Sequence, residues 1–283
     1  MTRKLHDILT AGVRNPAVVM GILNVTPDSF SDGGKYLDPQ AAGRQARRMI
    51  DCGAEIIDIG AESTRPGADT VPPDEQIRRL EEIVPAVVKT SAIVSVDTTS
   101  AAVADRALTW GAKIINDVSA GRDDPQILTL VAQRGAAIVL MHMLGRPRTM
   151  QDNPQYTDVT AEVKAFLAKR ISEAVAAGVD ESRIIIDPGI GFGKKLEHNL
   201  ALLRTVDDLG GLGRTILVGP SRKRFIGELG GAELPENRVG GTIGACLAAR
   251  RRGATIFRVH DVAPAVEALK VYDAVIASGS EVS

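Results

Sequence analysis

Aromatic residues are scarce in this chain of 283 residues, where Phe, Tyr and Trp together make up 3%. Hydrophobic residues nevertheless make up 44%, which is enough for a sizeable core. That core is expected to consist mostly of Ile, Val, Leu and Ala side chains. Such side chains suit parallel strands covered by helices better than they suit an antiparallel β-sandwich.

The chain also lacks a charge imbalance and long apolar runs. It carries 34 Lys and Arg residues against 35 Asp and Glu residues, so nothing favours nucleic acid as a partner. No stretch approaches the roughly 18 consecutive apolar residues that a membrane-spanning helix needs. The opening residues, MTRKLHDILT, lack the apolar centre of a signal peptide. We therefore expect a soluble, cytoplasmic protein without a membrane partner.

Cysteine and paired histidine are sparse as well. The two cysteines, Cys52 and Cys246, both fall in expected helices and have no metal-ligating spacing, which fits a reducing compartment. The four histidines include no pair at positions i and i+4, so the sequence predicts no zinc site.

What the chain does contain is a regular alternation of predicted strands and helices. Eight short apolar segments are expected to be strands, and each leads into a polar stretch and then a helix. These segments are residues 18–23, 55–59, 93–96, 114–115, 136–141, 184–186, 215–218 and 256–259. Such alternation needs parallel strands with helical crossovers, and eight units close into a (β/α)8 TIM barrel.

We expect a single domain over residues 1–283, with an ordered core of about 16–277 and a frayed C-terminal tail. Residues 72–90 and 236–252 are among the predicted helices, and residues 227–231 are expected to form a Gly-rich loop. An open, doubly wound sheet is the alternative fold. It would normally carry a GxGxxG fingerprint after its first strand, and none is present there.

Polar residues follow every predicted strand, and in a parallel barrel all these strand ends open on one face, where active sites lie. The tips are Asn24, the segment 63–65, Asp97, Asn116, His142, Asp187, the segment 221–223, and Arg258 with His260. Asp97, Asn116 and Asp187 suit a flat, nitrogen-rich heterocycle. Arg258, His260 and Asn24 suit a phosphate or diphosphate beside a hard cation. Lys223 is long enough to reach between the two groups.

Two further patterns are ambiguous. Residues 188–195, PGIGFGKK, resemble a phosphate-binding loop, but Lys195 occupies the position where GxxxxGK[ST] requires Ser or Thr. Its glycines are expected instead to allow a tight turn and close backbone approach. Met141 and Met143 either line an aromatic ligand or pack inside the barrel. His142 is either a packing residue at the barrel mouth or a wall of the site.

Seven segments can be taken together and in chain order: MGILNVTPDSFSDGG (20–34), ESTRPG (62–67), SVDT (95–98), INDV (115–118), DPGIGFGK (187–194), SRK (221–223) and RVHDV (258–262). This set resembles the bacterial dihydropteroate synthases over nearly the whole chain. The resemblance implies a transferase that condenses 6-hydroxymethyl-7,8-dihydropterin diphosphate with p-aminobenzoate. The products would be 7,8-dihydropteroate, for folate biosynthesis, and diphosphate. It also implies a homodimer, a Mg²⁺ cofactor and a p-aminobenzoate site open to sulfonamides.

The resemblance further implies a role for each matching residue. The pterin would be held by Asp97, Asn116, Met141, Asp187, Phe192, Gly219 and Lys223. The diphosphate would be held by Asn24, Thr64, Arg65, Arg258 and His260, with Asn24 also binding Mg²⁺. The p-aminobenzoate would be framed by Phe30, Arg65, Pro66, Ser221 and Lys223. The catalytic set would be Asp32, Asp97, Lys223, Arg258 and His260, and the first two loops would close over the substrates.

The chain departs from the resemblance at Ala61, Ile190 and Pro220, which affects the fine shape of the pocket and removes no polar group. The residues fit a dissociative, SN1-like displacement, in which fixed carboxylates favour a cation on the pterin side. No dedicated general base is required, because an arylamine is unprotonated near neutral pH.

Three competing interpretations remain. The first is a non-catalytic pterin-binding barrel that presents methyl-tetrahydrofolate to a corrinoid partner. The second is a phosphosugar aldolase or isomerase, although an aldolase would want a lysine within a strand. The third is a relative that keeps the fold and has lost turnover.

Overall fold

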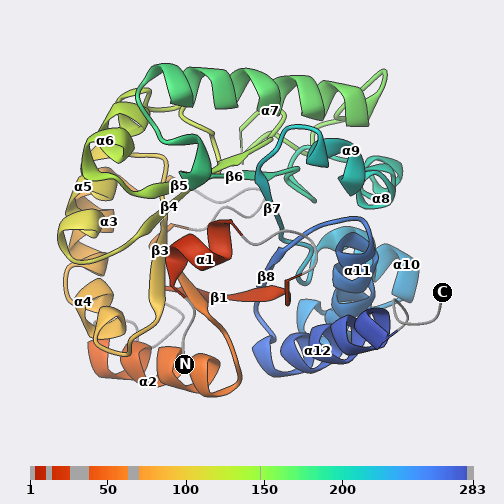
Figure 1. The fold of residues 1–283 in the computed structure, drawn as a ribbon, viewed down its shortest axis with the longest axis horizontal. Coiled ribbons are helices and arrows are strands. Elements are labelled where there is room, and N and C mark those ends of the chain that lie inside the picture. The colour runs from red at the N-terminus through yellow and green to blue at the C-terminus, as the bar shows by residue number, and fades with distance from the viewer. Residues whose placement is uncertain (1–3, 11–14, 26–37, 63–69, 147, 279–283) are drawn as a thin grey trace.

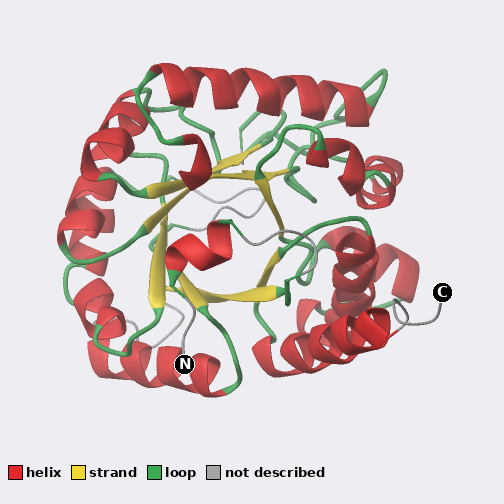
Figure 2. Cartoon of the chain, in the orientation of Figure 1, coloured by secondary structure: helices red, strands yellow, loops and turns green. Residues whose placement is uncertain are grey.

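The predicted strands form a closed barrel of eight parallel strands (Figures 1 and 2). The computed structural model describes residues 4–10, 15–25, 38–62, 70–146 and 148–278. The strands are β1 (Val18–Asn24), β2 (Ile56–Gly60), β3 (Ile93–Asp97), β4 (Ile114–Asp117), β5 (Ala137–Met141), β6 (Ile184–Asp187), β7 (Thr215–Val218) and β8 (Ile256–Val259). β1 pairs with β8 through Val18 and Ile256, which closes the ring. The (β/α)8 fold is thereby confirmed, and the open sheet is excluded.

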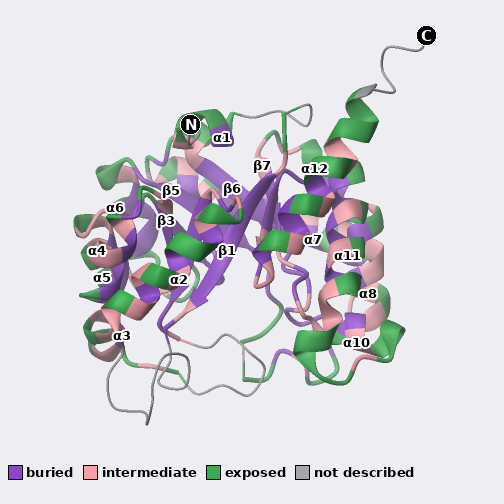
Figure 3. Cartoon of the chain, turned by 90° about the horizontal axis from the view of Figure 1, so that it is seen from below, coloured by how far each residue is buried: buried purple, intermediate pink, exposed green. Residues whose placement is uncertain are grey.

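Helices enclose the barrel, and their outer surfaces are exposed while the strands are buried (Figure 3). They are α2 (Pro39–Asp51), α3 (Pro73–Leu80), α4 (Ile83–Val88), α5 (Ala101–Thr109), α6 (Gln126–Arg134), α7 (Val159–Ala176), α8 (Leu196–Arg204), α9 (Val206–Gly210), α10 (Arg224–Gly230), α11 (Val239–Arg251) and α12 (Val262–Ser278). The described residues also form the 3-10 helices η1 (Glu181–Arg183) and η2 (Pro235–Arg238).

A short helix that the sequence analysis did not predict, α1 (Leu5–Leu9), lies across the ring of strands in Figure 1. Its Ile8 and Leu9 are buried in a cluster with Val18, Ile56 and Ile256, which stand at the starts of their strands. The hydroxyl of Thr215, the first residue of β7, donates to the Leu9 carbonyl over 2.7 Å. α1 therefore covers the amino-terminal end of the barrel.

Side-chain alternation along the strands explains how polar groups reach the barrel interior. In β2, Ile57 and Ile59 pack in the core between strands and helices, whereas Ile56 packs in the cluster inside the barrel. Asp58 therefore points inward above Ile56. In β8, Phe257 packs outward by the same alternation, which places Arg258 inside.

Two predicted segments differ from the structure. The helix predicted over residues 72–90 is divided into α3 and α4. Pro85 explains the division, because it cannot donate to the Glu81 carbonyl one turn earlier and its ring would clash there. The Gly-rich loop predicted at residues 227–231 is largely the helix α10. At Gly227, a Cβ would lie 2.5 Å from the Ala232 carbonyl oxygen, so this glycine lets the loop after α10 fold back against the helix.

Candidate active site

The carboxyl ends of the strands bring the predicted tip residues next to one another. Asn24 is in register with Gly60, Gly60 with Asp97, and Asp97 with Asn116. Further round the barrel, Met141 of β5 is in register with Asp187 of β6. These residues, far apart in the sequence, therefore share one mouth, at the end opposite α1.

Arg258 joins the buried polar groups of this mouth. Its Nε donates to Asp58 Oδ2 over 2.6 Å, and its Nη2 donates to Asp97 Oδ2 over 2.9 Å. Asn116 Nδ2 donates to the same Asp58 oxygen over 3.0 Å. Burial disfavours the charge of Arg258, but Asp58 and Asp97 outweigh it and raise the pKa of the guanidinium. The structure thus places Arg258 beside Asp97 and close to Asn116, two of the residues predicted to hold the heterocycle.

Asp58 is a site residue that sequence reasoning missed. Its side chain is fully buried, and it is the acceptor that Arg258 and Asn116 share. It lies two residues before the end of its strand, so a search of strand tips does not find it. The available signal was a carboxylate inside the otherwise apolar run IIDIG, since a buried charge is rarely tolerated without a partner.

The carboxyl of Asp97 is buried, and its pKa is shifted by its surroundings. Burial raises the pKa of Asp97 from its ordinary value of 3.8 to about 7, with the Arg258 charge opposing the rise and the Asp58 charge adding to it. Its protonation therefore changes near neutral pH. A perturbed carboxyl in a cleft is a candidate for a catalytic group.

Asp187 lies across the mouth and is held by the glycine-rich loop that follows it. Its Oδ1 accepts from the Gly189 N–H over 2.6 Å. Burial raises the pKa of Asp187 to about 6, and the Gly189 hydrogen bond and the Lys223 charge oppose the rise. At Gly189, whose φ is +68°, a Cβ would lie 1.9 Å from the His142 carbonyl oxygen. The expectation that these glycines serve close backbone approach is confirmed.

Lys223 approaches the same loop from the end of β7. Its Nζ lies 3.9 Å from the centre of the Phe192 ring, a cation–π contact. A Cβ at Gly191 would lie 2.8 Å from the Lys223 Cδ, so the loop also needs glycine there. Gly219, at the end of β7, lies against Arg258, whose Cβ would be 3.6 Å from a Cβ at that position. The predicted pterin residues Phe192, Gly219 and Lys223 thus adjoin Arg258 and Asp187.

Ser221 and His260 form a pair between the loops after β7 and β8. Ser221 Oγ lies 3.0 Å from His260 Nδ1 and accepts from the His260 backbone N–H over 3.1 Å. The resemblance implies that Ser221 contacts the p-aminobenzoate and that His260 contacts the diphosphate. The structure brings these two residues together through the Ser221 hydroxyl.

His142, which the sequence left between two roles, is a buried packing residue with a hydrogen-bonded ring. Its ring meets Phe166 edge-on at 4.9 Å, and its Nδ1 lies 3.0 Å from Lys194 Nζ. Burial and the nearby Lys194 charge lower the pKa of His142 to about 2, so the ring is neutral. Lys194 also donates to the Phe192 carbonyl over 3.0 Å. Burial lowers its pKa to about 7, with Asp187 opposing the fall.

Several predicted residues lie outside the described part of the chain: Phe30, Asp32, Thr64, Arg65 and Pro66. Asn24 is described, and it is half-buried at the end of β1. Among the described residues, no group of three or more His, Cys, Asp or Glu side chains could hold a metal ion. An amide oxygen at the mouth nonetheless fits Mg²⁺, which takes one or two protein oxygens and completes its shell with substrate phosphates and water.

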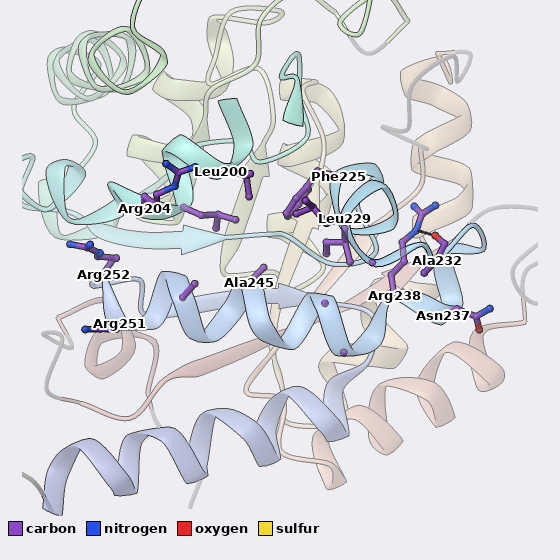
Figure 4. Close-up of a pocket in the computed structure, with 16 residues that line it drawn as sticks. Leu200, Arg204, Phe225, Leu229, Ala232, Asn237, Arg238, Ala245, Arg251 and Arg252 are labelled. Atoms are coloured by element: carbon purple, nitrogen blue, oxygen red, sulfur yellow. Dashed lines mark hydrogen bonds between the residues drawn. The ribbon is translucent and has the colours of Figure 1, made fainter. Parts of the chain in front are cut away.

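A separate cavity of about 660 Å³ lies outside the barrel between α8, α10 and α11 (Figure 4). Leu200, Phe225, Leu229 and Ala245 are among the residues that line it, with Arg204 and Arg252 near one end. None of the predicted site residues lines this cavity.

A closed parallel barrel with buried polar groups at the carboxyl ends of its strands has the architecture of a TIM-barrel enzyme. Comparison with known families narrows the class. The sequence profile described as "Pterin binding enzyme" matches residues 20–260. The fold and the site therefore define a pterin-binding enzyme.

Individual relatives give a finer assignment. The dihydropteroate synthase of Synechocystis sp. is 47% identical over 257 residues, covering 90% of this chain and 89% of that protein. The structure of Xanthomonas albilineans dihydropteroate synthase with 4-aminobenzoic acid has a TM-score of 0.87 and 48% identity, covering 93% and 94% of the two chains. That of the Yersinia pestis enzyme in a sulfonamide drug complex has a TM-score of 0.88 and 41% identity, covering 93% and 96%. The chain belongs to the dihydropteroate synthase family, and it is a transferase.

None of the described helices is both long enough and apolar enough to cross a bilayer.

Proposed function

We propose that this chain condenses 6-hydroxymethyl-7,8-dihydropterin diphosphate with p-aminobenzoate, releasing diphosphate and forming 7,8-dihydropteroate through a dissociative displacement. The observation that carries the proposal is the buried group in which Arg258 joins Asp58 and Asp97 while Asn116 donates to Asp58. This group offers a heterocycle fixed donors and acceptors in a site shielded from water.

Pterin recognition follows from the directions of these groups. Asp97 and Asp187 are acceptors for ring N–H and amino groups, and Asn116 can both donate and accept. Lys223, whose charge acts on Asp187, would donate to ring acceptors. Phe192, already against Lys223 Nζ, supplies an aromatic edge or face for the ring.

The proposed mechanism depends on the charges that form as the bond to diphosphate breaks. When the bond to diphosphate breaks, positive charge appears on the pterin side and negative charge on the leaving group. Ionised Asp97 stabilises the positive charge, because a fixed carboxylate in a poorly solvated site acts strongly on it. The amine of p-aminobenzoate then attacks the carbon and loses its proton to solvent, so no dedicated base is needed.

His260 and Asn24 are proposed to bind the diphosphate, together with Thr64 and Arg65. When bound, Mg²⁺ supplies positive charge that offsets the charge developing on the leaving group. Asn24 would contribute its protein ligand. Arg258, with its charge shared between two carboxylates, would adjoin both the ring and the leaving group.

The p-aminobenzoate is proposed to lie against Phe30, Pro66 and Ser221, with Asp32 in a loop that closes over the reaction. The matched X. albilineans and Y. pestis structures support this arm of the proposal, because they hold 4-aminobenzoic acid and a sulfonamide drug. Sulfonamides should therefore compete with p-aminobenzoate here.

The deciding experiment mixes the purified chain with both substrates, with and without Mg²⁺, and measures dihydropteroate by chromatography and diphosphate by a coupled assay. We expect both products in equal amounts, and little of either without Mg²⁺. Binding of the pterin without diphosphate release would instead support a non-catalytic carrier. The described strands contain no lysine, which argues against a Schiff-base aldolase.

We further propose that the protein is a cytoplasmic homodimer. Both cysteines are free thiols, which fits a reducing compartment. Val271, Val275 and Ile276 of α12 are each more than half exposed. These side chains offer a second copy an apolar surface. Light scattering of the purified protein should give twice the chain mass, and Val275→Asp should lower it.

A further inference from the structure

Arg222 has an unusual backbone conformation for its residue type. It lies between Ser221 and Lys223, in the loop that joins β7 to α10, and its φ is +58°. Left-handed backbone is rarely adopted by bulky side chains, and where it persists the surroundings must hold it. Neither the proposed substrates nor the roles assigned above use this side chain.

The surroundings hold Arg222 from three directions. Its Nε and Nη2 donate to the two carboxylate oxygens of Asp261, over 2.9 and 2.6 Å. Its backbone N–H donates to Thr242 Oγ1 over 3.0 Å, and its carbonyl accepts from Arg238 Nη1 over 3.1 Å. The planar fork of an arginine matches a carboxylate in this two-bond geometry, which a lysine cannot reproduce.

The partners connect two corners of the mouth. Asp261 follows His260 at the end of β8, while Arg222 follows Ser221 after β7. Ser221 and His260 are themselves joined at 3.0 Å. The two loops are therefore linked twice, once by Ser221 with His260 and once by Arg222 with Asp261. The ion pair is largely protected, since the two side chains are 29% and 19% exposed.

We propose that the Arg222–Asp261 ion pair is a positioning device for the transfer reaction. By fixing the left-handed turn, it sets Lys223 against Phe192 and holds His260 beside Ser221, so that the pterin-binding and diphosphate-binding groups keep one spacing. Arg222 and Asp261 act through their neighbours and do not touch the substrates. This inference rests on the roles proposed for Lys223 and His260.

A double-mutant cycle tests the coupling. Arg222→Lys keeps the charge and loses the two-bond fork, and Asp261→Asn changes one atom and removes the charge. Each single variant should lower kcat/KM for the pterin diphosphate about tenfold to a hundredfold. The kcat/KM of the double variant should be no more than about twofold below that of the less active single variant, because the interaction is lost only once.

A surface ion pair provides the matched control. Arg252 and Asp207 lie 2.9 Å apart, and their side chains are about half exposed. Arg252→Lys and Asp207→Asn should leave kcat and both KM values within about twofold of wild type. Thermal unfolding of all variants separates positioning from general loss of structure: kcat should fall in the Arg222 and Asp261 variants at temperatures where the protein is fully folded.

The outcomes separate this inference from the proposed function. A wild-type chain that makes no dihydropteroate contradicts the function itself. An active wild type with unchanged kinetics in Asp261→Asn overturns the positioning role alone, as does full additivity of the two substitutions. If Arg222→Lys does not fold, the kinetics of the milder Asp261→Asn decide the question.

Discussion

At the scale of single residues, two buried carboxylates at the mouth of the barrel share one cation. Arg258 lies between Asp58 and Asp97, so no carboxylate of this group is buried without a cation. Removing one member of such a group leaves another charge unpaired, which costs more than the net stability the pair provides. Substitutions here should therefore be isosteric.

Asp97→Asn should lower kcat by about a hundredfold to a thousandfold, because the variant lacks the negative charge that stabilises the cation. Arg258 retains Asp58, so the fold should survive. Steady-state kinetics with both substrates measure the fall in kcat, and circular dichroism checks that the variant is folded. Wild-type turnover in the folded variant would contradict the role of Asp97.

The pH dependence follows from the same carboxyl. Since the pKa of Asp97 is raised to about 7, the ionised, active form is lost as the pH falls below neutral. The value of kcat/KM for the pterin diphosphate should therefore rise with pH up to about 7, with a slope near one on a logarithmic scale. The Asp97→Asn variant should lack this limb. The same limb in both proteins would assign it to another group or to the substrate.

Stability should respond with the opposite sign. The pKa of Asp97 is higher in the folded protein than its ordinary 3.8, so the folded state binds the extra proton. This contribution is fully present below about pH 4 and is lost as the pH rises to about 7. The Tm of wild type should fall relative to that of Asp97→Asn between pH 5 and pH 8. A constant difference would show that Asp97 does not titrate in this range.

At the scale of elements, the loop after β6 shows what a glycine-rich segment does. Gly189→Ala should destabilise the protein and weaken pterin binding, because its Cβ would collide with the His142 carbonyl. Gly213→Ala is the matched control: its φ is +66° and nothing lies within 4 Å of its Cβ. It should cost only the roughly 1–2 kcal/mol of left-handed backbone. Chemical denaturation and pterin titration of both variants measure the difference.

The strands could be predicted from the sequence alone, whereas some helix boundaries and site residues could not. The strands were predictable because buried parallel strands are short apolar runs ending at polar residues. The boundaries of α10 were less accessible, since a glycine such as Gly227 is compatible with a closely packed helix and with a loop. Asp58 was missed, and Arg222 received no role of its own, because their contacts with Arg258 and Asp261 form only in the closed barrel.

At the scale of the whole molecule, stability and chemistry are divided between the two ends of the barrel. Ile8 is fully buried at the end opposite the site. Ile8→Ala should lower the free energy of unfolding by about 2–5 kcal/mol, because it leaves a cavity in the cluster under α1. Its kcat and KM values at 25 °C should match wild type. A large change in kcat would show that the two ends are coupled.

Helix α1 has one more consequence. The buried cluster under α1 fills the barrel at its amino-terminal end, so a ligand reaches Asp58 and Asp97 from the carboxyl-terminal mouth. A pterin bound against Asp58 and Asp97 would lie deepest in the site. An arylamine that bound first would block the entry of the pterin. For the proposed reaction we therefore predict a fixed order, in which pterin diphosphate binds before p-aminobenzoate and dihydropteroate leaves before the next cycle begins.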